Sequence, residues 1–126
     1  MSEIALSRAA GGAGGVARVS RFFHYSQNNS GGSFRLDLER GVTHHVVVEA
    51  FDATHANARA EAIGLYFDGR GDCPCCGNRW SEAWGDDGNE QPMVYDEPVS
   101  QFDGHCWMPE GQEIAVHYLD GRIVWA

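Results

Sequence analysis

The segment VVVEAFDATHANARAEAIGLYF, residues 46–67, predicts the centre of the fold, because it joins a strongly apolar strand to a helix. Its three consecutive valines lie in a strand expected over residues 42–51, and such a run is typical of a central strand covered on both faces. Asp52 or Thr54 then caps a helix of about three turns that stops at Gly64. Because the apolar face of this helix is mostly alanine, we expect it to lie close against a sheet.

The rest of the chain supplies shorter strands around this centre. They are expected at residues 18–26, 34–38, 65–67 and 79–84. A hairpin closes the chain, with strands at 113–118 and 123–125 joined by a two-residue turn at Asp120-Gly121. The sequence therefore predicts an α+β domain: a small antiparallel-type β-sheet with one packed α-helix, a cysteine-rich, zinc-binding loop and a C-terminal β-hairpin.

The first part of the chain differs from the rest in composition. Residues 1–17 end in a Gly/Ala run and are predicted to form a flexible leader, because they bury too little to offset their ordering entropy. An over-long gene assignment, with the true start near Val19, explains them equally well. Residues 18–126 form the single α+β domain. No segment resembles a signal peptide or a membrane span, so we expect a cytoplasmic protein without membrane contact.

Charge is distributed unevenly along the chain. The formal net charge is −9, made up of +2 over residues 1–41 and −11 over residues 42–126. Residues 81–113 contain nine acidic residues and no Arg or Lys. Such a stretch repels phosphate backbones, so direct nucleic-acid binding is not expected.

The run Cys73-Pro74-Cys75-Cys76-Gly77 carries the clearest chemical signal. Cys73 and Cys76 have the Cys-x-x-Cys spacing that delivers two thiolates to one zinc ion, and a reducing cytoplasm favours metal binding over a disulfide. We therefore predict a structural zinc site. Its predicted ligands are Cys73, Cys76, Cys75 and Cys106, with His105 and His117 as candidates for the fourth position.

Two alternatives for the cysteines stay open. They are reduced, partly buried thiols that act as small hydrophobic residues, or they are redox or nucleophilic groups like the Cys-Pro-x-Cys of thiol oxidoreductases. The second alternative requires a helix directly after the motif, whereas Gly77-Asn78 follows it without helical periodicity.

The histidines are first interpreted as ordinary residues. His44 and His45 are adjacent on an expected strand, so they should face opposite sides and not line one pocket. His24 and His55 are typical of surface or core positions. The chain lacks the sequence motifs of serine hydrolases, P-loop proteins and dinucleotide-binding proteins, so no reaction class is indicated.

Four blocks carry a resemblance to a known group of proteins. They are SQNNSGGSF (26–34), residues 46–69, DCPCCGNRW (72–80) and HYLDG (117–121). With its QNNSGG and DCxCCGxRW motifs, the chain resembles a family of small uncharacterised proteins of tailed bacteriophages. The resemblance implies expression in the cytoplasm of an infected bacterium, without an established activity. His105 and Cys106 lie outside the shared blocks, which favours Cys75 and His117 as ligands.

Three functions follow as hypotheses. The first is a non-enzymatic phage accessory protein, stabilised by structural zinc, that binds an unidentified host or phage protein. Its surface would combine the acidic stretch with Gln27, Asn28, Asn29, Arg79 and Trp80. The second is a zinc- or thiol-dependent enzyme, and the third is a structural component of the virion.

Overall fold

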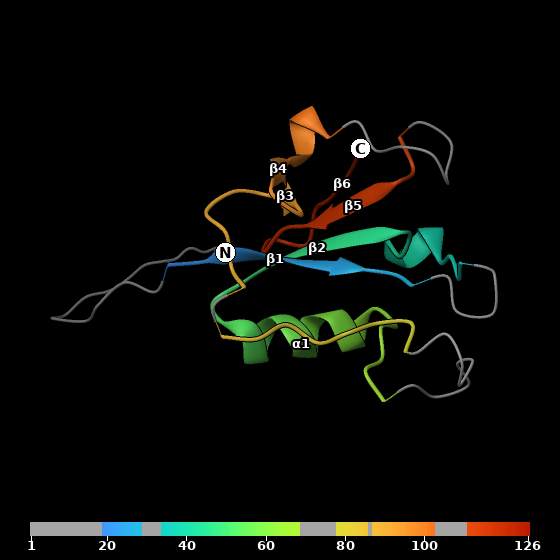
Figure 1. Cartoon of the computed structure of the whole chain (residues 1–126), viewed down its shortest axis with the longest axis horizontal. Coiled ribbons are helices and arrows are strands. Elements are labelled where there is room, and N and C mark those ends of the chain that lie inside the picture. Colours follow the sequence, from blue (N-terminus) through green and yellow to red (C-terminus); the bar gives the residue numbers. More distant parts are fainter. Residues whose placement is uncertain (1–18, 29–33, 69–77, 86, 103–110) are drawn as a thin grey trace, which may run out of the picture.

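Strand β2 (His45–Ala50) lies in the middle of a four-stranded sheet whose order is β1-β2-β5-β6. Its neighbours are β1 (Arg21–Ser26) and β5 (Ile114–His117), and β6 (Ile123–Trp125) follows β5. The computed structural model describes residues 19–28, 34–68, 78–85, 87–102 and 111–126 (Figure 1). The α+β class is confirmed.

The sheet is mixed, and the prediction of an antiparallel-type sheet is wrong for its central pair. β2 pairs antiparallel with β1 but parallel with β5, in a register that places His45 opposite Ile114. A parallel neighbour needs a crossover connection, and the long chain between β2 and β5, which includes the helix, provides it. The C-terminal hairpin of β5 and β6 is antiparallel, as predicted. The predicted two-residue turn is wrong, because Tyr118 N donates to Arg122 O at 2.9 Å and leaves a three-residue loop, residues 119–121, in which Gly121 has φ 95°.

Helix α1 (Ala53–Ala62) begins and ends where the sequence predicts. The Asp52 carboxylate accepts a hydrogen bond from His55 N at 2.7 Å, and Gly64 follows the end of the helix at φ 115°. Neither α1 nor any other helix in the described part of the chain has the length and apolar character needed to cross a membrane.

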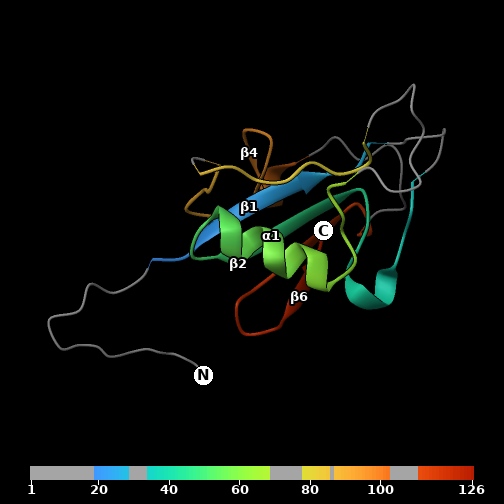
Figure 2. The ribbon, with the colours of Figure 1, turned by 90° about the horizontal axis from the view of Figure 1, so that it is seen from below.

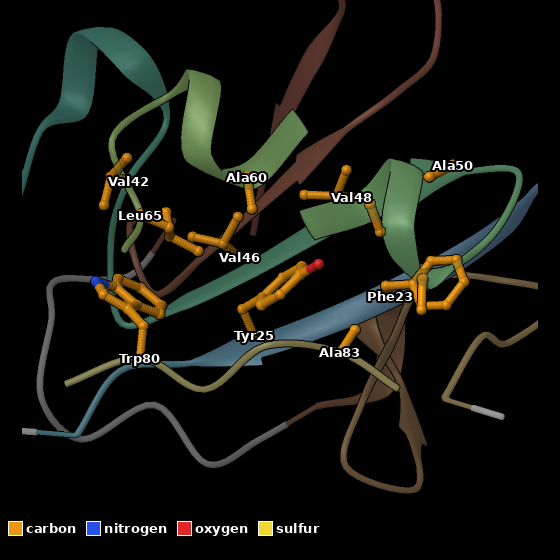
Figure 3. Close-up of a cluster of buried hydrophobic side chains, with 12 residues drawn as sticks. Phe23, Tyr25, Val42, Val46, Val48, Ala50, Ala60, Leu65, Trp80 and Ala83 are labelled. Carbon is orange, nitrogen blue, oxygen red and sulfur yellow. The ribbon is translucent and has the colours of Figure 1, made fainter. Parts of the chain in front are cut away.

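Helix α1 lies over the sheet (Figure 2), and one core cluster fills the space between them (Figure 3). Small side chains on α1, including the fully buried Ala56 and Ala60, let the helix approach β2 closely. Against them lie Val46 and Val48 of β2 and two aromatic residues of β1. Trp80, from the coil after the cysteine run, closes the end of this cluster.

A second cluster covers the opposite face of the sheet. Val47 packs there with Ile114 and Val116 of β5 and with Val94. Val94 belongs to a short hairpin of β3 (Met93–Val94) and β4 (Glu97–Pro98), followed by the 3-10 helix η4 (Val99–Gln101). Figure 1 shows this hairpin and α1 on opposite sides of the sheet. The predicted burial of β2 on both faces is therefore confirmed.

Several short strands were predicted wrongly. Residues 34–38 contribute only an isolated bridge between Asp37 and Val42, and a 3-10 helix η3 (Leu38–Arg40) follows. Residues 65–67 and 79–84 form no strand in the structure, although Leu65 and Trp80 are buried as strand residues would be. The apolar residues that predicted strands in these two segments reflect burial of their side chains. Neither segment joins a strand ladder through its backbone. The predicted leader lies outside the described residues.

Candidate metal centre

Two histidines and a glutamate meet where the parallel strands β2 and β5 begin. Because His45 is opposite Ile114, the preceding residues His44 and Glu113 are also neighbours. His45 N donates to Glu113 O at 3.0 Å, which fixes this end of the strand pair. The potential ligand atoms of His44, His45 and Glu113 all lie within 4.8 Å of one another.

The two adjacent histidines face the same group, so the prediction that they point to opposite sides is wrong. Strand β2 begins at His45, and His44 lies in the bend before it. The alternation of side chains along a strand therefore does not extend to His44. The two imidazole rings stack instead, with centroids 4.0 Å apart and planes inclined by 28°.

Glu113 is a carboxylate inside the protein. Glu113 is 0% exposed, and its Oε2 atom is paired with Nδ1 of His44. A buried carboxylate requires a compensating cation or hydrogen-bond donor, since transfer of an unpaired charge from water is strongly unfavourable. His44, whose side chain is 12% exposed, provides that partner and connects the centre to the surface.

His45 is held from several sides. Its Nδ1 atom lies 2.9 Å from Nε2 of His24, and the ring of Phe102 packs edge-on against it with centroids 5.5 Å apart. Burial, and secondly the charge of His44, lower the pKa of His24 to about 4. The His24 ring is therefore neutral near neutral pH, with one nitrogen that accepts a hydrogen bond and one that donates.

Tyr95 covers the His24–His45 pair from the β3–β4 turn. Its ring stands edge-on to both imidazoles, at centroid distances of 5.1 Å and 5.6 Å. Its hydroxyl lies 3.1 Å from the Ser26 hydroxyl. Among the described residues, Tyr95 is the one non-glycine residue with positive φ, at 57°. The backbone adopts an unfavourable conformation to place this side chain.

The donor set fits a first-row divalent cation. Imidazole nitrogens and a carboxylate oxygen are the ligands that zinc takes in sites with three protein ligands. Such an ion would take the place of the hydrogen bond between His44 and Glu113, because metal ligands must present free lone pairs. Three protein ligands leave one position of a tetrahedral ion for water or a further ligand.

Most of the metal ligands predicted from the sequence cannot be compared with this centre. Cys73, Cys75, Cys76, His105 and Cys106 lie outside the described residues.

His117 is described, and it lies elsewhere in the sheet. It is three residues beyond Ile114 along β5, about 10 Å further along the strand. Its Nε2 donates to Gly41 O at 2.8 Å, and burial lowers its pKa. A role of His117 as a zinc ligand stays a prediction.

The predicted interaction residues are mostly internal. Gln27, Arg79 and Trp80 are buried, and Asn29 lies outside the described residues. The Gln27 amide donates to Thr43 O at 3.2 Å and accepts from Arg79 Nη1 at 3.0 Å. Arg79 Nε also donates to the Tyr66 hydroxyl at 3.2 Å. These bonds give Gln27 and Arg79 a structural role, and among the described members only Asn28 is exposed.

Sequence reasoning did not find the centre. The adjacent His44-His45 pair was a visible signal, but its third member is 69 residues away from His44. Only the parallel pairing of β2 with β5 brings Glu113 beside it, and that pairing was not predicted.

The comparisons with known proteins identify one family. A family model described as a domain of unknown function (DUF7296) matches residues 20–125, a range that includes every residue of the centre. No curated protein and no solved structure matches the chain.

Proposed function

Because the chain belongs to the DUF7296 family, whose description assigns no function, we propose a function from its own geometry. In this proposal the chain is a small metal-binding protein, in which His44, His45 and Glu113 hold one divalent transition-metal ion. The observation that carries this proposal is the convergence of three ligand atoms within 4.8 Å around a fully buried carboxylate.

Zinc is the ion that fits these donors best. Two imidazoles and one carboxylate match its tetrahedral sites, whereas calcium and magnesium prefer shells built from oxygen ligands. The prediction of zinc binding is thus supported by His44, His45 and Glu113, and not by the cysteines on which the sequence prediction was based. The cysteine run is a separate zinc hypothesis, and each is tested by its own variants.

The ion's first role in this proposal is structural. It would join the starts of β2 and β5, which the chain brings together only after a long connection. A ligand that binds the folded state alone stabilises it in proportion to the logarithm of its concentration above the dissociation constant. The zinc-stabilised domain would then act as a non-enzymatic phage accessory protein, presenting its acidic surface to a host or phage protein.

A catalytic role is the second candidate, and one observation favours it. Three protein ligands leave a coordination position for water, and zinc lowers the pKa of bound water enough to generate a nucleophile. The His44 side chain is 12% exposed, so this ligand lies at the edge of the buried centre, next to solvent. X-ray absorption of the zinc-loaded protein separates the roles, because a fourth protein ligand means a closed structural site.

The central test is metal analysis of purified protein and its variants. We expect His45→Gln and Glu113→Gln to lose the bound zinc and the stabilisation by added zinc. His55→Gln, which changes a histidine of α1 on the other side of the sheet, serves as the matched control and should keep both. A Cys73→Ser, Cys76→Ser double variant measures the cysteine contribution separately. Wild-type zinc content in both His45→Gln and Glu113→Gln would refute this centre.

A further inference from the structure

His24 and His45 are diagonal neighbours on one face of the sheet. The β1–β2 register places His24 opposite Val47, two residues along β2 from His45. Side chains at such diagonal positions of an antiparallel pair are within reach when they are long or aromatic. Here the two rings approach to a centroid distance of 5.0 Å, with Nε2 of His24 and Nδ1 of His45 2.9 Å apart.

This contact determines which nitrogen of His45 can bind a metal. Nδ1 is occupied by His24, so only Nε2 can present its lone pair to an ion. When Nε2 is the ligand, Nδ1 must carry the hydrogen of the neutral ring, and it donates that hydrogen to Nε2 of His24. Metal-bound histidines generally donate their second ring N–H to such an acceptor, which fixes the ring and its tautomer.

We propose that His24 is the positioning residue of the metal centre, holding the His45 ring in the Nδ1–H tautomer so that Nε2 is directed to the ion. The inference rests on the proposed metal-binding function. His24 does not touch the ion in this arrangement and acts only through His45.

Tyr95 and Ser26 complete the support of this pair. The Tyr95 ring stands at 84° to His24 and at 85° to His45, so one aromatic ring packs against both imidazoles at once. The hydrogen bond between its hydroxyl and Ser26 ties the turn to the end of β1. Strained backbone is retained where the surroundings hold it in place, and functional sites are where such residues cluster. The left-handed conformation of Tyr95 is explained if its ring must lie over these histidines.

The first measurement concerns the metal-free protein. Nitrogen-15 NMR of the imidazoles should show His45 in the Nδ1–H form in the wild type. His24→Phe keeps an aromatic ring but removes the acceptor, and we expect it to shift His45 towards the Nε2–H form. His24→Gln supplies a carbonyl acceptor and should restore Nδ1–H at least in part. A wild-type His45 in the Nε2–H form, or one unchanged by His24→Phe, would overturn the inference.

The second measurement is zinc affinity by competition with a chromophoric chelator. We expect the dissociation constant to rise about 10- to 100-fold in His24→Phe, less in His24→Gln, and not at all in the His55→Phe control. Unaltered affinity in a folded His24→Phe protein would also overturn the inference. A wild type that binds no zinc, yet holds His45 as Nδ1–H, would refute the proposed function while supporting the control of His45 by His24.

Discussion

The His117 imidazole packs directly on the backbone of Gly41. Its Nε2 donates to the Gly41 carbonyl at 2.8 Å, and a Cβ added at Gly41 would lie 2.6 Å from both Cε1 and Nε2 of the ring. Gly41 also has a left-handed conformation, with φ 73°, at the end of η3. Two independent constraints, conformation and contact, therefore require glycine here.

Gly41→Ala should destabilise the protein by about 2–4 kcal/mol. Roughly 1–2 kcal/mol comes from the left-handed backbone and the rest from displacing the buried His117 ring. Gly111→Ala is the matched control, because Gly111 has φ 84° but open space around its Cα. Urea denaturation of both variants separates the two contributions. Equal losses in the two variants would show that the contact with His117 has no energetic weight.

The Asn57 amide joins α1 to β1 and to the coil after Trp80. Its Oδ1 accepts from the Tyr25 hydroxyl at 2.7 Å and from Ala83 N at 2.8 Å, and its Nδ2 donates to Ala83 O at 3.0 Å. Asn57→Ala leaves these groups without their partner, for an expected loss of about 2–4 kcal/mol. Glu61→Ala, at an exposed position of the same helix, should change the unfolding free energy by less than about 0.5 kcal/mol. A neutral Asn57→Ala would contradict the structural role of the amide.

Arg59 holds the C-terminal half of α1 to strand β2 and to the residue that follows β5. Its Nη1 donates to Glu49 O at 2.5 Å and its Nη2 to Tyr118 O at 3.0 Å. The planar guanidinium makes both bonds at once, whereas a lysine ammonium is a single point donor. We expect Arg59→Lys to lose roughly 1–2 kcal/mol by thermal or chemical unfolding, and Arg59→Met to lose more, because it removes both donors. The interpretation fails if Arg59→Lys is as stable as the wild type.

The sequence predicts those features of the fold that depend on residues close together in the chain, and it misses those that depend on distant residues. The cap at Asp52 and the stop at Gly64 are local features, and the structure confirms them. The hairpin turn is confirmed in its place along the chain, but its loop has one residue more than predicted. The strand predicted at 79–84 failed because its apolar pattern reflects burial without backbone pairing. Its Ala83 is held by the side chain of Asn57, which no periodicity can reveal.

The candidate centre was less accessible to sequence reasoning, for a reason of geometry. The alternation of side chains along a strand predicts opposite sides for His44 and His45 only if both lie in β2, yet the strand starts at His45. Glu113 was one acidic residue among many, and its burial follows only from the parallel pairing of β5 with β2. Both errors concern strand ends and long-range register, which local patterns specify weakly.

Acid should destabilise the metal-free protein through His24. Its pKa is about 4 in the folded state, below the ordinary value of 6.5. Between these pH values the unfolded state binds more protons than the folded state. The contribution of His24 to the free energy of unfolding is therefore fully present above pH 6.5 and is lost as the pH decreases towards 4. The difference corresponds to at most about 3 kcal/mol. His117, whose pKa burial also lowers, acts in the same direction.

Urea denaturation in the presence of a chelator, at pH 7 and pH 4.5, measures this loss. His24→Gln removes the titrating group while keeping a polar side chain, so its stability should change much less between the two pH values. Asp120 does not interfere, because its pKa is lowered from 3.8 by Arg122 and its contribution is lost only at lower pH. Parallel losses in the wild type and His24→Gln would mean that other groups carry the acid sensitivity, and that His24 is not held neutral by its surroundings.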